Sequence, residues 1–465
     1  MNYVKGISRK QVELSSLEDH IDEESEVRAI DALIESMDIK DLGFKEGNNE
    51  NSGRSMYSPM DLIKLYVYGY FNGIRSSRKL EKQAKINLEV KWLLKGVQPK
   101  HSVISDFRKE HIDCFDNLFK NLINICNDFN LIGKELIAID GTKIRADAAK
   151  SKYYTLKKLK FMEELTEEKL KEYLKALEEN DCKEATKEIS DRIKVLEEKK
   201  ELYNELKEVL NDTSGISLTD PDAKRMKTGN TKGTIIGYNV QTAVDEKNKL
   251  IIDYEVRNDA VDQGLLYDVA KNAKEKLGVD SIEVLADKAY FKSEDIIKCE
   301  ENGIVPYVPK QKVVTPNIDS GYIKEKFIYD KDNDMYICPA GKKLYMRSKS
   351  EDVKMKIYYN YEECQNCPYR DKCTTSKYGR HIERNPKEEI VENAIERFNA
   401  NGAKYKKRQM IVEHPFGTLK RVMNFEYFLL RGKKLVSGET GLAFFCYNMK
   451  RLINIKGTKE IVASI

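Results

Sequence analysis

Short apolar segments with the length of β-strands alternate with helical segments in the middle of this chain, and this order limits the folds available. The strand-like segments are residues 135–139, 233–244, 249–256, 281–286 and 304–310, the last of them interrupted by prolines. The second and third are joined by a short turn, which predicts an antiparallel hairpin. The last two are each preceded by a helical segment. The sequence therefore predicts an α/β fold in which helices surround a mixed central sheet.

Residues 1–130 are predicted to be all-helical. One helix begins in "SPMDLIKLYVYGYFNG", where Ser58 suits the cap, Pro59 the first helical position and Asp61 the positive N-terminal end. Two interpretations remain for the basic residues that follow. One is a packing domain with ordinary surface arginines, and the other is a helix-turn-helix that contacts phosphates through Arg75, Arg78, Lys79 and Arg108.

Residues 151–212 interrupt the predicted sheet with a long helical insertion. Its leucines and isoleucines recur at helical spacing on both sides of "ENDC", residues 179–182. This pattern predicts two antiparallel helices that form a hairpin. The charges of both signs between the apolar positions indicate a solvated face, and we assign no chemistry to this segment.

Composition excludes some classes of protein. The chain has 465 residues, of which 40% are hydrophobic and 34% charged, and no run of eighteen apolar residues appears. We therefore expect no membrane span and, since the first residues lack an apolar core, no secretory signal. Nine cysteines in such a chain favour a reducing compartment. The net charge of +4 implies no partner by itself, so a nucleic-acid surface must appear as local clustering.

Two aspartates follow predicted strands. Asp140 comes after the strand "ELIAI", which we expect to end there, and Asp287 comes after "SIEVLA". If the two strands are neighbours, both carboxylates reach one crevice at the carboxyl edge of the sheet. With a glutamate from a helix over that edge they form an all-oxygen site, which suits Mg²⁺ or Mn²⁺. Taken alone, each aspartate is better explained as a turn former.

The string "IVEHPFGTLKR" supplies that glutamate, Glu413. Pro415 removes a helical hydrogen bond and crowds the carbonyl of Ile411, so we expect a kink within a turn of Glu413. Gly417 then permits a close approach of the main chain to phosphate. The alternative is that a new helix starts at His414 and that Glu413 is a linker residue.

Basic residues gather around this string. The segment from Lys404 to Lys434 contains nine lysines and arginines but only two glutamates, together with several aromatic residues. This density suits a phosphate backbone. A solvated helix face is the alternative interpretation.

Four cysteines suggest a second site. They are Cys338 in "YICPAGKKL" and Cys364, Cys367 and Cys373 in "CQNCPYRDKC". The C-x₂-C pair is half of a zinc site, whereas the other spacings are less regular. A structural Zn²⁺ therefore competes with a reduced, metal-free cluster and with a disulfide formed after purification. We expect the remaining thiols to be buried or incidental, namely Cys114, Cys126, Cys182, Cys299 and Cys446.

Taken together, these segments resemble the DDE transposases of bacterial insertion sequences, and in particular the IS-eleven-eighty-two-like group. The similarity rests on "YSPMDLIKLYVYGYFNGIRSSRKLE", "HSVISDFRKEH", "IAIDGTKIRA", "DPDAKRM", "GYNVQTAVD", "LADKAYFKSEDI" and "KKRQMIVEHPFGTLKR", which span nearly the whole chain. The resemblance implies a ribonuclease H-like core in which Asp140, Asp287 and Glu413 are catalytic and hold two divalent ions. It also implies hydrolysis and strand transfer on double-stranded DNA, by a homodimer that binds terminal inverted repeats and target DNA in the bacterial cytoplasm, at the nucleoid.

The family signature is matched with one departure. Tyr405, Glu413 and Lys420 can be matched to it, but four residues separate Arg408 from Glu413 where the signature has three, so Arg408 would lie roughly 140° around an ideal helix from Glu413. Lys420 is therefore the better candidate for a contact to the DNA end. The resemblance implies that the DNA-binding residues are Tyr405, Arg408, Lys420, Arg421, Arg75, Arg78 and Arg108.

The predicted domains are a helical DNA-binding domain at 1–130, a first part of the core at 131–310, a cysteine-containing insertion at 311–400 and a last part of the core at 401–465. Two other functions stay open. One is a catalytically idle protein that recognises element ends, and the other is a ribonuclease H-like nuclease without strand transfer. The presence of all three acids favours the active transposase.

Overall fold

The computed structural model describes residues 3, 6, 8–12, 14–45, 56–179, 183–210, 215–228, 233–311, 318–346 and 355–465, without the side chains of 183–185. Contacts divide the chain into two units. The first comprises residues 1–133, 140–261 and 410–465, and the second comprises 134–139 and 262–409. The N-terminal helices share a unit with much of the sheet.

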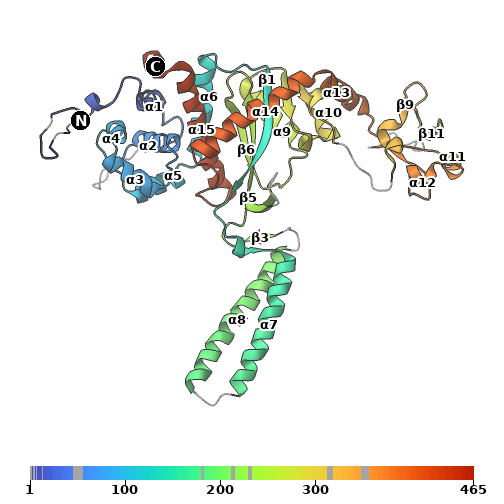
Figure 1. Ribbon diagram of the computed structural model, residues 1–465, viewed down its shortest axis with the longest axis horizontal. Helices are drawn as coiled ribbons and strands as arrows, with labels where there is room; N and C mark the ends of the chain where they lie inside the picture. Colours follow the sequence, from blue (N-terminus) through green and yellow to red (C-terminus); the bar gives the residue numbers. More distant parts are fainter. Residues whose placement is uncertain are drawn as a thin grey trace. The chain divides into compact units, whose positions relative to one another are not determined.

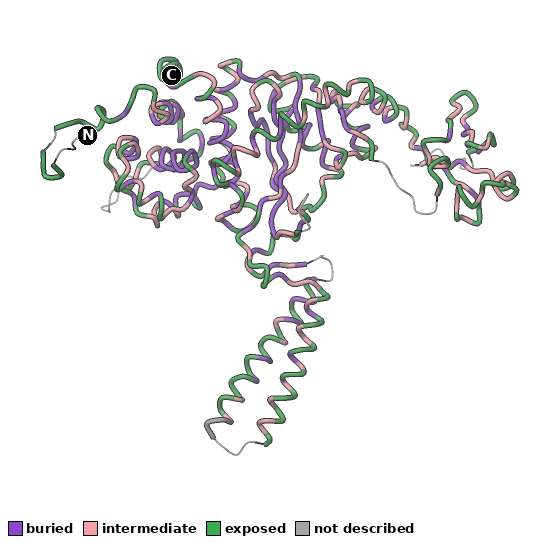
Figure 2. The backbone as a smooth tube through the Cα atoms, viewed as in Figure 1, coloured by how far each residue is buried: buried purple, intermediate pink, exposed green. Residues whose placement is uncertain are grey.

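The first unit begins with short helices, as predicted. They are η1 (Glu18–His20), α1 (Glu26–Glu35), α2 (Pro59–Phe71), α3 (Ser77–Ile86), α4 (Leu88–Leu93), α5 (His101–Glu110) and α6 (Cys114–Asp128). Pro59 opens α2, although the Ser58 side chain makes no cap hydrogen bond. The apolar side of α6 packs on α15 (Lys433–Lys456), which also contacts α2 and β6 (Ile251–Arg257). Figure 2 shows the buried stretches of these helices in purple.

The sheet of the first unit has the strand order β4-β5-β1, with β6 also paired to β5. The remaining strands are β1 (Leu136–Arg145), β4 (Lys224–Lys227) and β5 (Thr234–Asp245). Both β4 and β6 pair with β5 in antiparallel fashion, which confirms the predicted hairpin. A Cβ at Gly237 of β5 would collide with the carbonyl oxygen of Ile144, so the two strands approach closely there.

The helical insertion is a hairpin, as its pattern predicts. Helices α7 (Leu156–Glu178) and α8 (Lys183–Leu210) run side by side in Figure 1. At its base a small apolar cluster joins Leu159 to Tyr203, Leu206 and Leu210. The base also includes η2 (Lys150–Lys152) and the short paired strands β2 (Tyr153–Tyr154) and β3 (Ile216–Ser217).

In the second unit, the first residues of β1 belong to a parallel array with the order β1-β7-β8. Its elements are α9 (Leu266–Leu277), β7 (Ile282–Ala286), η3 (Lys288–Tyr290), α10 (Ser293–Glu301), β8 (Ile304–Tyr307) and α13 (Glu388–Ala400). Gly278 takes the left-handed conformation that ends α9. Parallel strands next to antiparallel ones give the mixed α/β, ribonuclease H-like sheet that the sequence predicts.

A second, antiparallel sheet with the order β13-β12-β11-β10-β9 belongs to the same unit. Its elements are η4 (Ser320–Tyr322), η5 (Lys324–Lys326), β9 (Ile328–Asp330), β10 (Met335–Ile337), β11 (Lys343–Met346), β12 (Lys356–Tyr359), α11 (Tyr361–Gln365), α12 (Arg370–Cys373) and β13 (Ile382–Arg384). Its core is aromatic, built on Phe327, Tyr336 and Tyr358, and three of the predicted cluster's cysteines pack against it.

The C-terminal part contains α14 (Gly402–Gly417), the π-helix η6 (Thr418–Val422), α15 and α16 (Thr458–Ser464). Within the described residues, no helix is long and apolar enough to cross a bilayer.

Candidate active site

Asp140 lies within β1 and is half-buried. The prediction that the strand ends at Asp140 is wrong. The strand continues to Arg145 because Thr142, Ile144 and Ala146 alternate inward past the acid. The Thr242 hydroxyl of β5 donates to the Asp140 carbonyl at 3.1 Å, and the Gly141 N–H donates to the Asp140 carboxylate at 2.9 Å. The main chain is therefore fixed on both sides of this carboxylate.

Asp287 follows β7 directly, as predicted, and occupies the N-cap position of the short helix η3 without a side-chain cap hydrogen bond. Its Oδ2 lies 3.5 Å from an Nη atom of Arg408 on α14. The Arg408 side chain is only 15% exposed and that of Asp287 is 42% exposed, so the ion pair opens to solvent on the side of the acid. Arg408, which does not match the spacing of the family signature, is thus a largely buried neighbour of Asp287.

The strand segments that precede the two aspartates are parallel neighbours within the second unit. Residues Leu136 to Ile139 pair in register with Glu283 to Ala286. In the sequence, Asp140 and Asp287 each come directly after this paired segment. The pairing of β1 with β7, which sequence reasoning had to assume, is therefore present.

Glu413 is an exposed residue of α14. Ile411, Val412 and Pro415 of the same helix are buried, so the glutamate lies off the packed face. The helix runs on through Pro415, and the alternative in which a new helix starts at His414 is wrong. His414 is itself exposed, but its Nδ1 hydrogen-bonds with the Tyr447 hydroxyl at 2.9 Å, and partial desolvation of the ring lowers its pKa. The irregularity comes after Gly417, where five residues form the π-helix η6.

That π-helix carries the two basic candidates that follow the glutamate. Lys420 is half-buried and Arg421 is exposed. Burial lowers the pKa of Lys420, while the nearby carboxylates of Glu426 and Asp140 act to raise it. Short π-helical segments are frequent at functional sites. Lys420 thus stands in the electrostatic field of the first candidate acid.

Tyr405 lies on the first turns of α14. Its ring packs edge-on against Phe398 of α13, with 4.9 Å between the centroids. The residue is half-buried, so part of its surface remains accessible.

Arg75 and Arg108 are buried, contrary to their prediction as surface contacts to phosphate. Arg75 is 4% exposed, and its Nη2 donates to Glu439 at 2.6 Å and to the Tyr427 carbonyl at 2.7 Å. The Arg108 guanidinium lies over the Tyr66 ring. Glu439 also accepts from the N–H groups of Leu429 and Leu430, so its charge is well compensated. We therefore leave both arginines out of the DNA surface proposed below, whereas Arg78 is exposed and stays in it.

Sequence reasoning missed the role of the acids in "DPDAKRM". Asp220 is fully buried and accepts from the Tyr238 hydroxyl at 2.8 Å and from the Gly432 N–H at 3.1 Å. Asp222 accepts from the Lys433 N–H at 2.8 Å. These acids fix the start of α15. The signal available beforehand was only the recurrence of this block in the family that the chain resembles.

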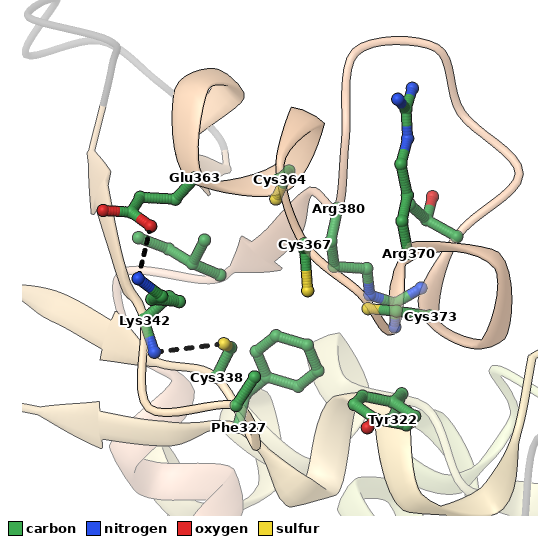
Figure 3. Close-up of a pocket in the computed structure, with 13 residues that line it drawn as sticks. Tyr322, Phe327, Cys338, Lys342, Glu363, Cys364, Cys367, Arg370, Cys373 and Arg380 are labelled. Carbon is green, nitrogen blue, oxygen red and sulfur yellow. Dashed lines mark hydrogen bonds and ion pairs between the residues drawn. The ribbon is translucent and has the colours of Figure 1, made fainter.

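The four cysteines of the second candidate site line one pocket in the second unit, and Figure 3 shows their sulfurs facing it. All four are free thiols, and burial raises the pKa of Cys373 to about 11. The Lys342 N–H donates to Cys338 Sγ at 3.3 Å. Cys114, Cys126, Cys299 and Cys446 are buried, as predicted. Cys182 lies outside the described residues.

The residue types at each candidate site are suitable ligands for the metal predicted there, but the described side chains are not close enough together to form a complete ligand set. Among the described residues, no three His, Cys, Asp or Glu side chains stand close enough together to hold a metal ion. Four thiols around one pocket are the donors of a structural zinc site. Carboxylates are the donors for Mg²⁺ or Mn²⁺. In both sites, metal binding therefore requires the side chains to draw together.

Comparison with protein families agrees with these features. A model described as "Transposase DDE domain" matches residues 337–453, which include Glu413, Lys420 and the four pocket cysteines. A model described as "Transposase domain (DUF772)" matches residues 15–110, which include helices α1 to α5. No curated protein matches the chain.

Both matches are to transposases, one near each end of the chain, and the mixed sheet is ribonuclease H-like. The chain accordingly carries two transposase-family domains, one of them a DDE domain, which is consistent with a DDE transposase of an insertion sequence. Neither match specifies an insertion-sequence group.

Proposed function

We propose that the protein is an active transposase that binds the terminal inverted repeats of its own insertion sequence, cleaves phosphodiester bonds there and joins the 3′ ends to target DNA. The observation that carries the proposal is the parallel register of Ile139 with Ala286, one residue before Asp140 and Asp287. The match of a DDE domain over Glu413 supports the third acid. An idle DNA-binding protein would need none of these acids.

Asp140, Asp287 and Glu413 are proposed as the oxygen donors for two divalent ions. Such ions, when bound, activate a water or 3′-hydroxyl and stabilise the leaving oxygen. Asp140 is held by its strand neighbours, while Glu413 is an exposed side chain on a helix. We infer that Asp140 fixes the position of the site and that Glu413 moves to complete it. Arg408 neutralises Asp287 until then, and its guanidinium is afterwards available to a DNA phosphate.

Lys420, Arg421, Tyr405 and Arg78 are proposed to contact the DNA backbone. Lysine and arginine neutralise phosphates, which supplies affinity without sequence information. We further propose that the protein acts as a homodimer on DNA in the bacterial cytoplasm, where its DNA substrate lies. We also propose that the pocket cysteines hold one structural Zn²⁺, since four thiols face a single pocket.

The test separates binding from cleavage on duplexes that carry the inverted repeats flanking the coding region. Asp140→Asn should bind them like wild type but cleave on the order of 10³-fold more slowly in Mg²⁺. Lys420→Ala should do the reverse, with weaker binding, a shallower salt dependence and residual cleavage at high protein concentration. Cleavage by Asp140→Asn at the wild-type rate would refute the proposed chemistry.

A further inference from the structure

A basic pocket lies at the base of the α7–α8 hairpin in the first unit, and none of the three candidate acids lines it. Its volume is about 240 Å³, and its walls come from the start of α7, strand β2 and the ribbon formed by β4 and β5. The residues that line it are Lys150, Tyr153, Thr155, Lys158, Arg225, Thr234 and Ile236. Three of them are cations and none is a carboxylate.

The described residues supply no carboxylate partner for the positive charge of this pocket. Among the described residues, no carboxylate forms an ion pair with Lys150, Lys158 or Arg225. Two lysines further along the hairpin do form ion pairs, Lys207 with Glu163 and Lys200 with Glu167. A concentration of uncompensated cations in one hollow is an electrostatic arrangement that attracts an anion.

Two of the cations are held in place by the protein. The Lys158 ammonium donates to the carbonyls of Ser151 at 2.5 Å and Tyr153 at 2.9 Å, and lies over the Tyr154 ring. An ammonium has three N–H donors, so one remains for a ligand. Arg225 donates from Nε to the Thr234 hydroxyl at 3.1 Å, which fixes the plane of its guanidinium. Because these side chains are already ordered, an anion would bind with a smaller loss of entropy.

The first turn of α7 adds to the positive field. Thr155 caps this helix by accepting from the Lys158 N–H at 3.3 Å, and it lines the same pocket. The N-terminal end of a long helix carries a partial positive charge and favours anions.

We propose that this pocket binds a phosphodiester of duplex DNA, an inference that rests on the proposed transposase function and assigns the hairpin base to its DNA surface. Further exposed cations continue beyond the pocket, namely Lys152, Lys157, Lys160 and Lys227. A row of cations suits a polymer of phosphates better than a single small anion.

The test compares two double variants that remove the same charge. Lys150→Ala/Arg225→Ala changes the pocket, and Lys169→Ala/Lys194→Ala changes exposed positions along the hairpin shaft as a control. Lys158 is retained because its hydrogen bonds support the local fold. Affinity for a short duplex of arbitrary sequence is measured over a salt series, and thermal stability is measured with and without inorganic phosphate.

We expect the pocket variant to bind DNA on the order of tenfold more weakly than the control, with a salt slope shallower by roughly 0.9 for each phosphate that the protein no longer neutralises. Equal affinities for the two variants, with wild-type binding intact, would overturn the pocket's role and leave the proposed function standing. Stabilisation by inorganic phosphate that only the pocket variant loses, without a change in DNA affinity, would assign the pocket to a free anion and also overturn it. If the wild type binds no duplex at all, the proposed function itself fails.

Discussion

At the residue scale, the buried Arg75–Glu439 pair shows most clearly where a local pattern misleads. Arg75 was predicted on a DNA surface because it lies in a basic, helical stretch. Its partner is 364 positions further along the chain. No local pattern contains that information, since the burial of Arg75 results from the packing of distant segments around it. The Phe425 and Tyr427 rings, 4.7 and 5.1 Å from the guanidinium, complete the enclosure.

We predict that Arg75→Met destabilises the fold by about 3–5 kcal/mol, because it leaves the buried Glu439 carboxylate without its cation. The exposed Arg78→Ala should change stability by less than about 0.5 kcal/mol. Urea unfolding of both variants measures the difference. An unchanged unfolding midpoint for Arg75→Met together with a weaker, less salt-dependent affinity for DNA would show that Arg75 is a phosphate contact after all.

Lys420 should make DNA binding sensitive to alkaline pH. Burial disfavours its ammonium, so in the free protein it loses its proton below the ordinary lysine pKa of 10.5. In the window between the lowered pKa and 10.5, this group therefore makes folding more favourable as pH rises. A bound phosphate favours the charged form, so DNA affinity should fall as pH rises through the lowered pKa.

A series of dissociation constants from neutral to alkaline pH measures this effect. Lys420→Arg keeps its charge throughout and serves as the control. The same pH dependence in wild type and in Lys420→Arg would show that another group is responsible.

At the element scale, periodicity predicted most of the secondary structure, and the differences have local causes. The hairpin helices, β5, β6 and β7 lie where their patterns place them. Strand β1 is longer than predicted. Its first part is a continuous apolar run, whereas beyond Asp140 the inward residues Thr142 and Ile144 alternate with Lys143 and Arg145. Helix α14, which carries Glu413, continues through Pro415. The α-helical hydrogen-bonding pattern changes only after Gly417, where the π-helix η6 begins. Tertiary packing of Ile411, Val412 and Pro415 outweighs the helix-breaking tendency of proline there.

The candidate site was predictable only in part. The three acids were identified from strand ends, from one irregular helix and from a family resemblance. The ion pair of Arg408 with Asp287 and the basic pocket at the hairpin base could not be identified, because both join segments far apart in the sequence.

The cysteine pocket supplies the prediction at this scale. Freshly purified protein should contain about one Zn²⁺ per chain, because four thiols are the usual complement of a structural site. Cys364→Ser/Cys367→Ser should lose the metal and destabilise the antiparallel sheet of the second unit, against which Cys364 packs. Metal analysis and thermal unfolding provide the two measurements. Cys126→Ser, at a buried thiol outside the pocket, should retain the metal.

Zinc-free wild-type protein with four titratable pocket thiols would establish a reduced cluster instead. Zinc-free protein in which those thiols appear only after reduction would establish a disulfide. Either outcome would exclude the proposed zinc site.

At the scale of the whole molecule, the account depends on acids from separate segments acting as one site. Residues that act as a unit are strongly non-additive, since removal of the first abolishes what the second contributes. Independent residues would instead have effects that add. This distinction does not require the acids to be assembled in the DNA-free protein.

The most direct measurement is therefore the cleavage rate of Asp140→Asn, Asp287→Asn and the double variant, on duplexes carrying the flanking inverted repeats with Mg²⁺. The exposed Asp280→Asn serves as the control. We predict that each single variant loses on the order of 10³-fold in rate, that the double variant loses no more than the worse single variant, and that the control cleaves like wild type. Near-wild-type cleavage by either single variant, or losses that multiply in the double variant, would contradict a shared catalytic site.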